Sequence, residues 1–208
     1  ETMRAIAIRI YDLIQWGGVR YAKRYVERVR RVFLADLERH NFAATRAVVW
    51  NLAKLMLIKD EFYVAYLLTS YEKLRRDRQR YNVNPANGDR IRYKRTFHPR
   101  FFGRQIDIPI PHWTLYILRK FRFLRRVLPW YHTQDRQFLR WYEGLVDGFA
   151  FTDDASYAQY VEALETVRTV TGYSEIRWPK MEAARARAEQ ILAAVRKAKA
   201  SHGPKLTV

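Results

Sequence analysis

Apolar residues recur every three to four positions over most of the chain, which is the spacing of one face of an α-helix. Glycine or proline stands near several of the places where this pattern stops, as at Gly17-Gly18, Pro129 and Gly172. We therefore predict a mainly α, multi-helix domain over residues 1–208, with a flexible tail at 201–208. The expected helices cover residues 2–15, 19–38, 42–58, 62–80, 112–128, 134–149, 155–171 and 180–199.

Three of these helices carry sharper expectations. The helix over 42–58 is apolar almost all round, so we expect it to be buried, with Asn41 as its cap. The helix over 180–199 should have Pro179 in its first turn. Two core-facing stripes are predicted: Trp113, Ile117, Phe121, Leu124 and Leu128 in one helix, and Met181, Ala184, Ala188, Ile191 and Val195 in the other.

The helical pattern of the sequence stops after residue 81. Residues 82–89 are rich in Asn, Pro and Gly, which favours a loop. Residues 90–94 then alternate polar and apolar side chains, as a half-buried strand does, and residues 101–108 supply a partner. We expect a small two-stranded β excursion near residues 90–108.

The amino-acid composition limits the kinds of active site and metal site that the chain can form. Of the 208 residues 49% are hydrophobic, including 6 Trp, 14 Tyr and 11 Phe, so the chain can bury enough apolar surface to fold. There is no cysteine, which removes disulfides, thiol nucleophiles, cysteine-based zinc sites and cysteine-ligated iron–sulfur clusters. This composition fits a reducing cytoplasm, and we expect neither a membrane span nor a signal peptide.

Positive charge is concentrated in the middle of the chain. The formal net charge is +18, and residues 70–140 contain 18 Lys or Arg against 5 Asp or Glu. Such a field attracts polyanions, so two basic runs, at 73–80 and 119–126, are expected to face an acidic partner. The candidate partner-binding residues are Arg75, Arg76, Arg78, Arg80, Arg119, Lys120, Arg122, Arg125 and Arg126.

Residues of the types used in catalysis do not form a recognisable site. Gly17-Gly18 lacks the strand-to-helix context of a phosphate loop, and the five histidines never stand four residues apart. The carboxylate pairs Asp60-Glu61 and Asp153-Asp154 stand at expected helix starts, where acids complement the helix dipole. We therefore predict no catalytic, cofactor-binding or metal-binding residue in this segment.

The run at 119–126 has other interpretations. Its arginines and aromatics together are typical of a surface that grips phosphates and stacks bases, while an amphipathic helix with solvated arginines has the same pattern. Because Phe121 and Leu124 belong to the expected core stripe, few aromatics are left to stack on bases. A module lying on a membrane surface is a further alternative.

Several ordered segments together resemble a known domain. They are Tyr11–Ile14, Tyr21–Tyr25, Lys54–Ala65, Tyr93–Phe101, Gly103-Arg104, Trp113–Leu115, Leu124–Arg126, Tyr142-Glu143 and Glu175–Arg177 with Lys180. In this order they are similar to the C-terminal accessory domain of fused indolepyruvate (2-oxoacid) ferredoxin oxidoreductases. One departure is Trp178-Pro179, which follows Ile176-Arg177 where that family reads Gly-aromatic-Gly.

The resemblance implies an assembly that decarboxylates a 2-oxoacid oxidatively to an acyl-CoA. The family uses thiamine diphosphate, Mg and iron–sulfur clusters, which the resemblance places in partner domains, and no catalytic residue carries over to this segment. Its implied role is a non-catalytic structural or assembly domain, fused to or associated with the catalytic subunits, with ferredoxin or another electron acceptor engaged through the complex. The alternative is a free-standing basic nucleic-acid-binding protein.

Overall fold

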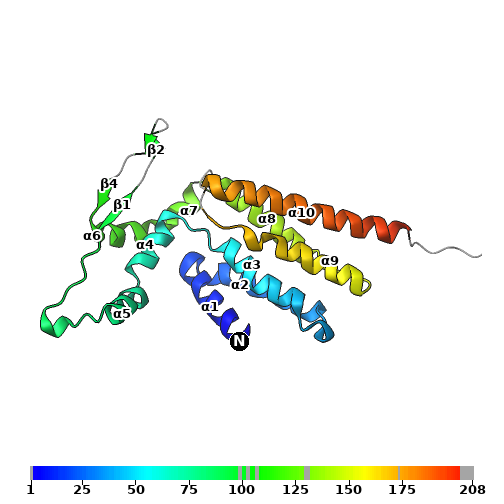
Figure 1. Cartoon of the computed structure of the whole chain (residues 1–208), viewed down its shortest axis with the longest axis horizontal. Coiled ribbons are helices and arrows are strands. Elements are labelled where there is room, and N and C mark those ends of the chain that lie inside the picture. The colour runs from blue at the N-terminus through cyan, green and yellow to red at the C-terminus, as the bar shows by residue number, and fades with distance from the viewer. Residues whose placement is uncertain are drawn as a thin grey trace, which may run out of the picture. The chain divides into compact units, whose positions relative to one another are not determined.

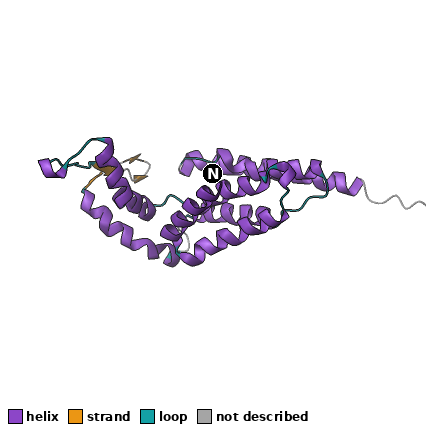
Figure 2. Cartoon of the chain, turned by 90° about the horizontal axis from the view of Figure 1, so that it is seen from below, coloured by secondary structure: helices purple, strands orange, loops and turns teal. Residues whose placement is uncertain are grey.

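The computed structural model of the chain describes residues 2–97, 100–101, 104–105, 108–128, 132–172 and 174–201. Helices make up most of these residues, which confirms the mainly α fold class (Figures 1 and 2). Residues 202–208, most of the expected tail, lie outside the described part.

The α-helices are α1 (Thr2–Gly17), α2 (Val19–Ala35), α3 (Ala43–Met56), α4 (Glu61–Thr69), α5 (Tyr71–Arg80), α6 (His112–Leu118), α7 (Leu124–Val127), α8 (Thr133–Asp147), α9 (Asp154–Glu165) and α10 (Ser174–Ser201). Short 3-10 helices are η1 (Glu38–His40), η2 (Pro85–Asn87), η3 (Arg119–Phe123) and η4 (Thr166–Thr169). The strands are β1 (Arg95–Phe97), β2 (Arg100–Phe101), β3 (Arg104–Gln105) and β4 (Ile108–Ile110).

The chain divides into two compact units, where the sequence predicts a single helical domain. Unit 1 combines residues 1–58 with 132–208, and unit 2 comprises residues 59–131. The main hydrophobic cluster draws only on unit 1. In unit 2, α4 packs on α6 and η3, so the apolar residues of this segment form contacts among themselves.

Helix α3 is the centre of unit 1. Ten of its fourteen residues are buried, which confirms the expectation drawn from its apolar circumference. Helices α1, α2, α8 and α9 all pack against it (Figure 1). With neighbours on so many sides, α3 holds the other helices of the unit in place.

The buried side chains of Tyr25, Asn51 and Tyr142 in unit 1 all have hydrogen-bond partners. Tyr25 donates from its hydroxyl to the carbonyl of Val49 (2.9 Å), and Tyr142 donates to the carbonyl of Leu164 (2.9 Å). The amide of Asn51 donates to the same Leu164 carbonyl (3.1 Å). Because each buried hydroxyl keeps a hydrogen bond, burial costs little, and it raises the pKa of both tyrosines.

The start of α3 differs from the expectation. Asn41 does not cap the helix, because Asn41 and Phe42 both adopt the left-handed conformation, with φ of 53° and 50°. The carboxylate of Asp36 takes that role, accepting from the backbone N–H and the hydroxyl of Thr45 (2.7 and 2.6 Å). Tyr157 of α9 also donates to Asp36 (2.7 Å), so the cap ties α3 to α9.

Both carboxylate pairs start helices, as predicted. Asp60 accepts from the backbone N–H of Tyr63 (2.7 Å) at the start of α4. Asp153 accepts from the N–H of Ser156 (2.7 Å), and the Ser156 hydroxyl in turn accepts from the N–H of Asp153 (3.1 Å). This reciprocal pair is a capping box at the start of α9.

Helix α10 confirms its predicted stripe and corrects its predicted start. Met181, Ala184, Ala188, Ile191 and Val195 are all buried. The helix nevertheless begins at Ser174, which places Pro179 inside it instead of in the first turn. A proline there removes one hydrogen bond to the carbonyl four residues earlier.

In unit 2 the predicted helix over 62–80 is two helices. Ser70 has an extended backbone (φ −69°, ψ 147°) that ends α4, and its hydroxyl accepts from the N–H of Lys73 (3.3 Å) at the start of α5. Phe62, Tyr63 and Ala65 of α4 are buried, while no residue of α5 is. The break therefore separates a packed helix from an exposed one.

The predicted helix over 112–128 is also interrupted, and its core stripe is wrong. The chain passes from α6 through η3 to α7, and a 3-10 helix has 3.0 residues per turn instead of 3.6. The predicted phase is already wrong in α6, where Leu115 takes the buried position, and the change of period in η3 shifts the phase further, leaving Leu124 and Leu128 half-buried. Trp113 is 62% exposed, Ile117 48% and Phe121 41%, whereas Leu115 and Arg125 are buried.

Antiparallel strand pairs occupy part of the predicted β excursion. β1 pairs with β4, with Arg95 opposite Ile110, and β2 pairs with β3, with Arg100 opposite Gln105. The strands lie later than expected, because residues 90–94 have no strand structure. Residues 98–99, 102–103 and 106–107 of the predicted excursion lie outside the described part.

Candidate partner-binding surface

Helix α5 carries the first basic run. Arg78 and Arg80 lie in its last turn, where the helix dipole favours positive charge. A helix that is polar all round gains little from packing, and α5 buries none of its residues. It therefore needs an anchor from side chains elsewhere in unit 2.

Tyr93 provides that anchor, through Asp77 of α5. Lys73 forms an ion pair with Asp77, and the Tyr93 hydroxyl donates to the same carboxylate (2.8 Å). These two hydrogen bonds hold the pKa of Asp77 below its ordinary value. Lys73 Nζ also lies 4.5 Å from the centre of the Tyr93 ring, which stacks on His112 of α6 at 4.7 Å. The charge of Lys73 is thus matched within the unit.

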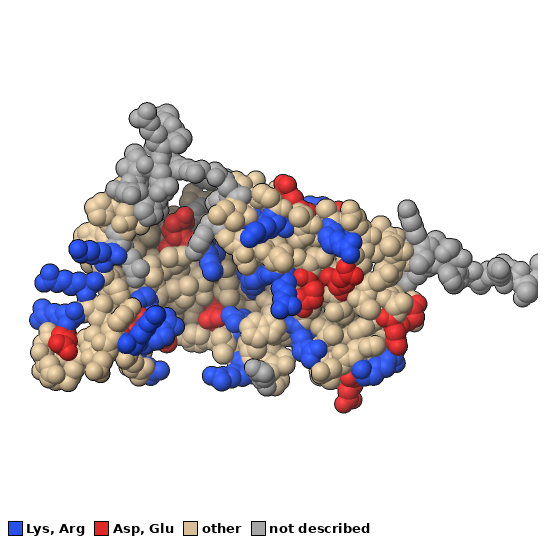
Figure 3. All heavy atoms as spheres, in the orientation of Figure 1, with Lys and Arg blue, Asp and Glu red and all other residues tan. Residues whose placement is uncertain are grey.

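Four arginines of α5 remain exposed, and we call them the α5 arginine cluster: Arg75, Arg76, Arg78 and Arg80. The Arg75 guanidinium lies 5.9 Å from the ring centre of Tyr71, and that of Arg80 lies 5.7 Å from Tyr81. Figure 3 shows blue side chains gathered over this part of unit 2, with little red among them. These predicted residues are placed where a partner could reach them.

The second basic run is placed differently from the expectation. Arg125 is only 8% exposed, and it forms an ion pair with the buried Asp60 and donates from Nη2 to Oδ1 (2.7 Å). Arg119 is half-buried and donates to the Thr69 hydroxyl (3.1 Å). The expectation that Arg125 faces a partner is therefore wrong, because the shortened turn of η3 directs it to the interior.

The rest of the second run is exposed where it is described. Lys120 and Arg122 lie at the surface, and the side chain of Arg126 lies outside the described part. The sequence could not separate Arg125 from its neighbours, since arginines at 122, 125 and 126 look alike in a helical pattern. The only signal was Asp60, 65 residues earlier, and no local rule links the two.

Aromatic side chains are more accessible in unit 2 than the sequence suggested. Tyr71 is 69% exposed, Tyr81 63% and Phe123 54%, in addition to the exposed stripe of α6. The expectation that few aromatics are free to stack on bases depended on the buried stripe. Because the stripe is exposed, that expectation is wrong too. The surface thus combines arginine and aromatic groups.

Residues 2–190 match the model of a family of unknown function, DUF6537. The chain belongs to this family. No curated protein matches it, and no solved structure does. The part matched to DUF6537 contains both basic runs.

Metal-ligating side chains and long apolar helices would indicate other kinds of site in this DUF6537 member. Among the described residues, no three His, Cys, Asp or Glu side chains are grouped so that they could hold a metal ion. His98 lies outside the described part, His112 stacks on Tyr93, and His132 pairs with Asp135 in unit 1 (3.3 Å). No helix in the described ranges has the length and apolar character that crossing a membrane requires.

Proposed function

We propose that this chain is a non-catalytic assembly domain of a cytoplasmic 2-oxoacid (indolepyruvate-like) ferredoxin oxidoreductase. The α5 arginine cluster docks on an acidic surface of the catalytic domains or subunits. These partners hold thiamine diphosphate, Mg and iron–sulfur clusters, make acyl-CoA from a 2-oxoacid and pass electrons to ferredoxin or another acceptor. The resemblance in sequence, which runs through nearly the whole chain, supports this choice of assembly.

The observation that carries the docking role is the exposure of the four arginines on a helix with no buried residue. Like charges on neighbouring turns repel one another, which destabilises α5 until a counter-charge approaches. The helix is nevertheless held in place, through Asp77 and Tyr93. A positioned cluster of exposed cations is what electrostatic docking uses to steer and orient a partner.

Charge reversal on α5 tests the docking role. Arg76 and Arg78 have no aromatic neighbour among the described contacts, so Arg76→Glu with Arg78→Glu leaves the arginine–tyrosine contacts of α5 in place, and only Arg76 also acts on the charge of Asp77. We expect this pair to weaken co-purification with the catalytic subunits at least tenfold and to slow association, more strongly at low salt. The matched control is Arg20→Glu with Lys23→Glu, which reverses two exposed charges on α2. Equal recovery of the complex with both pairs would refute the proposal.

An activity test addresses the non-catalytic part of the proposal. The chain alone should neither bind thiamine diphosphate in calorimetric titration nor reduce a dye with any 2-oxoacid. The reason is that its sequence has no cysteine and no glycine-rich phosphate-loop motif, and that its two carboxylate pairs, Asp60-Glu61 and Asp153-Asp154, start helices. Stoichiometric cofactor binding by the chain would contradict it.

A second candidate function is single-stranded nucleic-acid binding. The specific observation that favours it is the pairing of exposed Tyr71 and Tyr81 with Arg75 and Arg80, since bases stack on such groups. Fluorescence anisotropy with a labelled oligonucleotide separates the candidates. A nucleic-acid binder keeps sub-micromolar affinity at about 150 mM salt, whereas a protein-docking surface loses its weak, non-specific binding there, where the Debye length is about 8 Å.

A further inference from the structure

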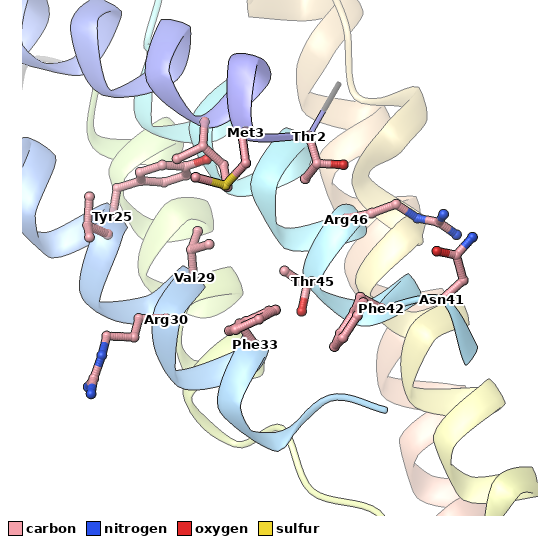
Figure 4. Close-up of a pocket in the computed structure, with 12 residues that line it drawn as sticks. Thr2, Met3, Tyr25, Val29, Arg30, Phe33, Asn41, Phe42, Thr45 and Arg46 are labelled. Atoms are coloured by element: carbon pink, nitrogen blue, oxygen red, sulfur yellow. The ribbon is translucent and has the colours of Figure 1, made fainter. Parts of the chain in front are cut away.

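A second feature of the molecule lies in unit 1, away from the basic runs. Helices α1 and α2 and the start of α3 enclose a cavity of about 410 Å³ (Figure 4). Its walls are mainly apolar, and it is lined by Thr2, Met3, Ile6, Tyr25, Val26, Val29, Arg30, Phe33, Asn41, Phe42, Thr45 and Arg46. Small-molecule sites have volumes of about 300–1,000 Å³, and a cavity of about 150 Å³ already holds benzene.

The interior of the cavity offers no free hydrogen-bonding group among its buried side chains. The Tyr25 hydroxyl is committed to the carbonyl of Val49 (2.9 Å), and the Thr45 hydroxyl is committed to Asp36 (2.6 Å). A polar group brought into this space would therefore lose its hydrogen bonds to water without replacement. The part of a ligand that fills the cavity has to be apolar.

The mouth of the cavity has the opposite character. Arg30 of α2 and Arg46 of α3 line it on opposite sides, both are exposed, and their side chains extend outward from the cavity (Figure 4). Neither guanidinium has a hydrogen bond or ion pair among the described contacts, and none of the described residues that line the cavity is an acid. Two unmatched cations at the rim of an apolar space favour an anionic group at that level.

The wall of the cavity also has exposed apolar side chains. Phe33, which the periodicity of α2 assigns to the buried face, is 48% exposed, and Met3 is 78% exposed. Phe33 lies against Phe42 with ring centres 5.2 Å apart, and Phe42 is held there in the left-handed conformation. An occupant would cover these side chains, which is a favourable change because exposed apolar surface is removed from water.

We propose that this cavity binds an anionic amphiphile, with an apolar chain or ring system inside and one negatively charged head group at its mouth, which the flexible side chains of Arg30 and Arg46 reach by turning inward. This assignment goes beyond the docking role of α5 and does not depend on it. Its occupant is a free small molecule. A membrane surface carrying anionic lipid shares the head-group chemistry and is distinguished by the experiment below.

The experiment titrates the 208-residue chain by calorimetry with three ligands below their micelle concentrations: decanoate, decanol and decyltrimethylammonium. We expect decanoate to bind at one site and at least about tenfold more tightly than either of the others. Arg30→Gln with Arg46→Gln should lower the affinity for decanoate about tenfold, because charge-assisted hydrogen bonds to the carboxylate are lost. The affinity for decanol should not change. Arg20→Gln, an exposed arginine of α2 outside the cavity, is the matched control and should bind decanoate as the parent does.

A variant that fills the cavity gives an independent readout. Val26 lines the mouth and is 37% exposed, so Val26→Trp adds an indole without disturbing the core. It should abolish binding of decanoate and decanol alike. Equal affinity for all three ligands, an unchanged affinity in the double arginine variant, or no binding at all would each overturn the proposal. If the chain instead sediments with vesicles of anionic phospholipid and does not bind decanoate, the proposal is overturned in favour of binding to a membrane surface.

Discussion

The ion pair between Asp60 and Arg125 is the contact on which the stability of unit 2 should depend most. Arg125→Met keeps a long apolar side chain in place of the arginine and leaves the Asp60 carboxylate buried, at 1% exposure, without its cation. The carboxylate would keep only its bond from the Tyr63 backbone N–H among the hydrogen bonds described above. The perturbation therefore leaves an uncompensated charge inside the unit.

The expected loss of stability is large. Removing one partner of a buried ion pair costs about 3–5 kcal/mol, against an unfolding free energy of about 5–15 kcal/mol for an ordinary domain. Because the helix N-cap bond of Asp60 survives, we expect about 3 kcal/mol. Asp60→Asn added to Arg125→Met removes both charges and keeps a good N-cap residue. The double variant should therefore recover at least about 1 kcal/mol relative to Arg125→Met.

Urea unfolding followed by circular dichroism, together with hydrogen exchange of the α4 amides, measures these differences. Lys120→Met is the control, since Lys120 is exposed on η3, and it should change stability by less than about 0.5 kcal/mol. If Arg125→Met costs no more than Lys120→Met, the pair does not stabilise unit 2. If the double variant is as unstable as the sum of its two single changes, the charges are not coupled.

Three further predictions concern unit 1. Leu52→Ala in α3 should cost about 2–5 kcal/mol by urea midpoint, and Leu34→Ala, at a site 65% exposed, less than about 0.5 kcal/mol; equal costs would contradict the central role of α3. Gly17→Ala should destabilise by about 1–3 kcal/mol, because the new Cβ would lie 2.7 Å from the ring of Tyr21; a gain in stability would refute this. Burial, with a smaller effect of Arg177, lowers the pKa of Lys54 from 10.5 to about 8. Between pH 8 and pH 10.5 the unfolded chain therefore binds more protons than the folded chain, so the free energy of unfolding should rise with pH in this range. The Lys54→Met variant should lack that rise in urea midpoint, and a parallel pH profile would contradict the assignment.

The exposure of the α5 arginine cluster is the part of the candidate site that the local sequence pattern predicts. A run of arginines with few apolar neighbours has no stripe to bury, so its exposure follows from the sequence. Arg125 belongs to an equally basic run, yet it is buried. Its position depends on a change from α to 3-10 geometry and on an acid 65 residues away, neither of which a helical period reports.

The cavity of unit 1 was beyond sequence reasoning for a related reason. Phe33 fits the buried face of α2, and the periodicity gives no sign that a neighbour is missing on that side. What leaves it exposed is the path of residues 36–42, where Asp36 is drawn to Thr45 and Tyr157 and the next turn takes two left-handed residues. That path depends on contacts between α3 and α9.

The sequence by itself determined the helical class, the buried character of α3, the stripe of α10 and the acidic starts of α4 and α9, because each follows from residues within one or two turns of one another. Tertiary structure alone decided the division into two units, the phase of residues 112–128 and the partner of Arg125. Each of these depends on which surfaces meet after the chain has folded back on itself. Contacts between distant segments override a local period whenever burying one side chain, such as Arg125 against Asp60, stabilises the fold more than keeping the helix regular.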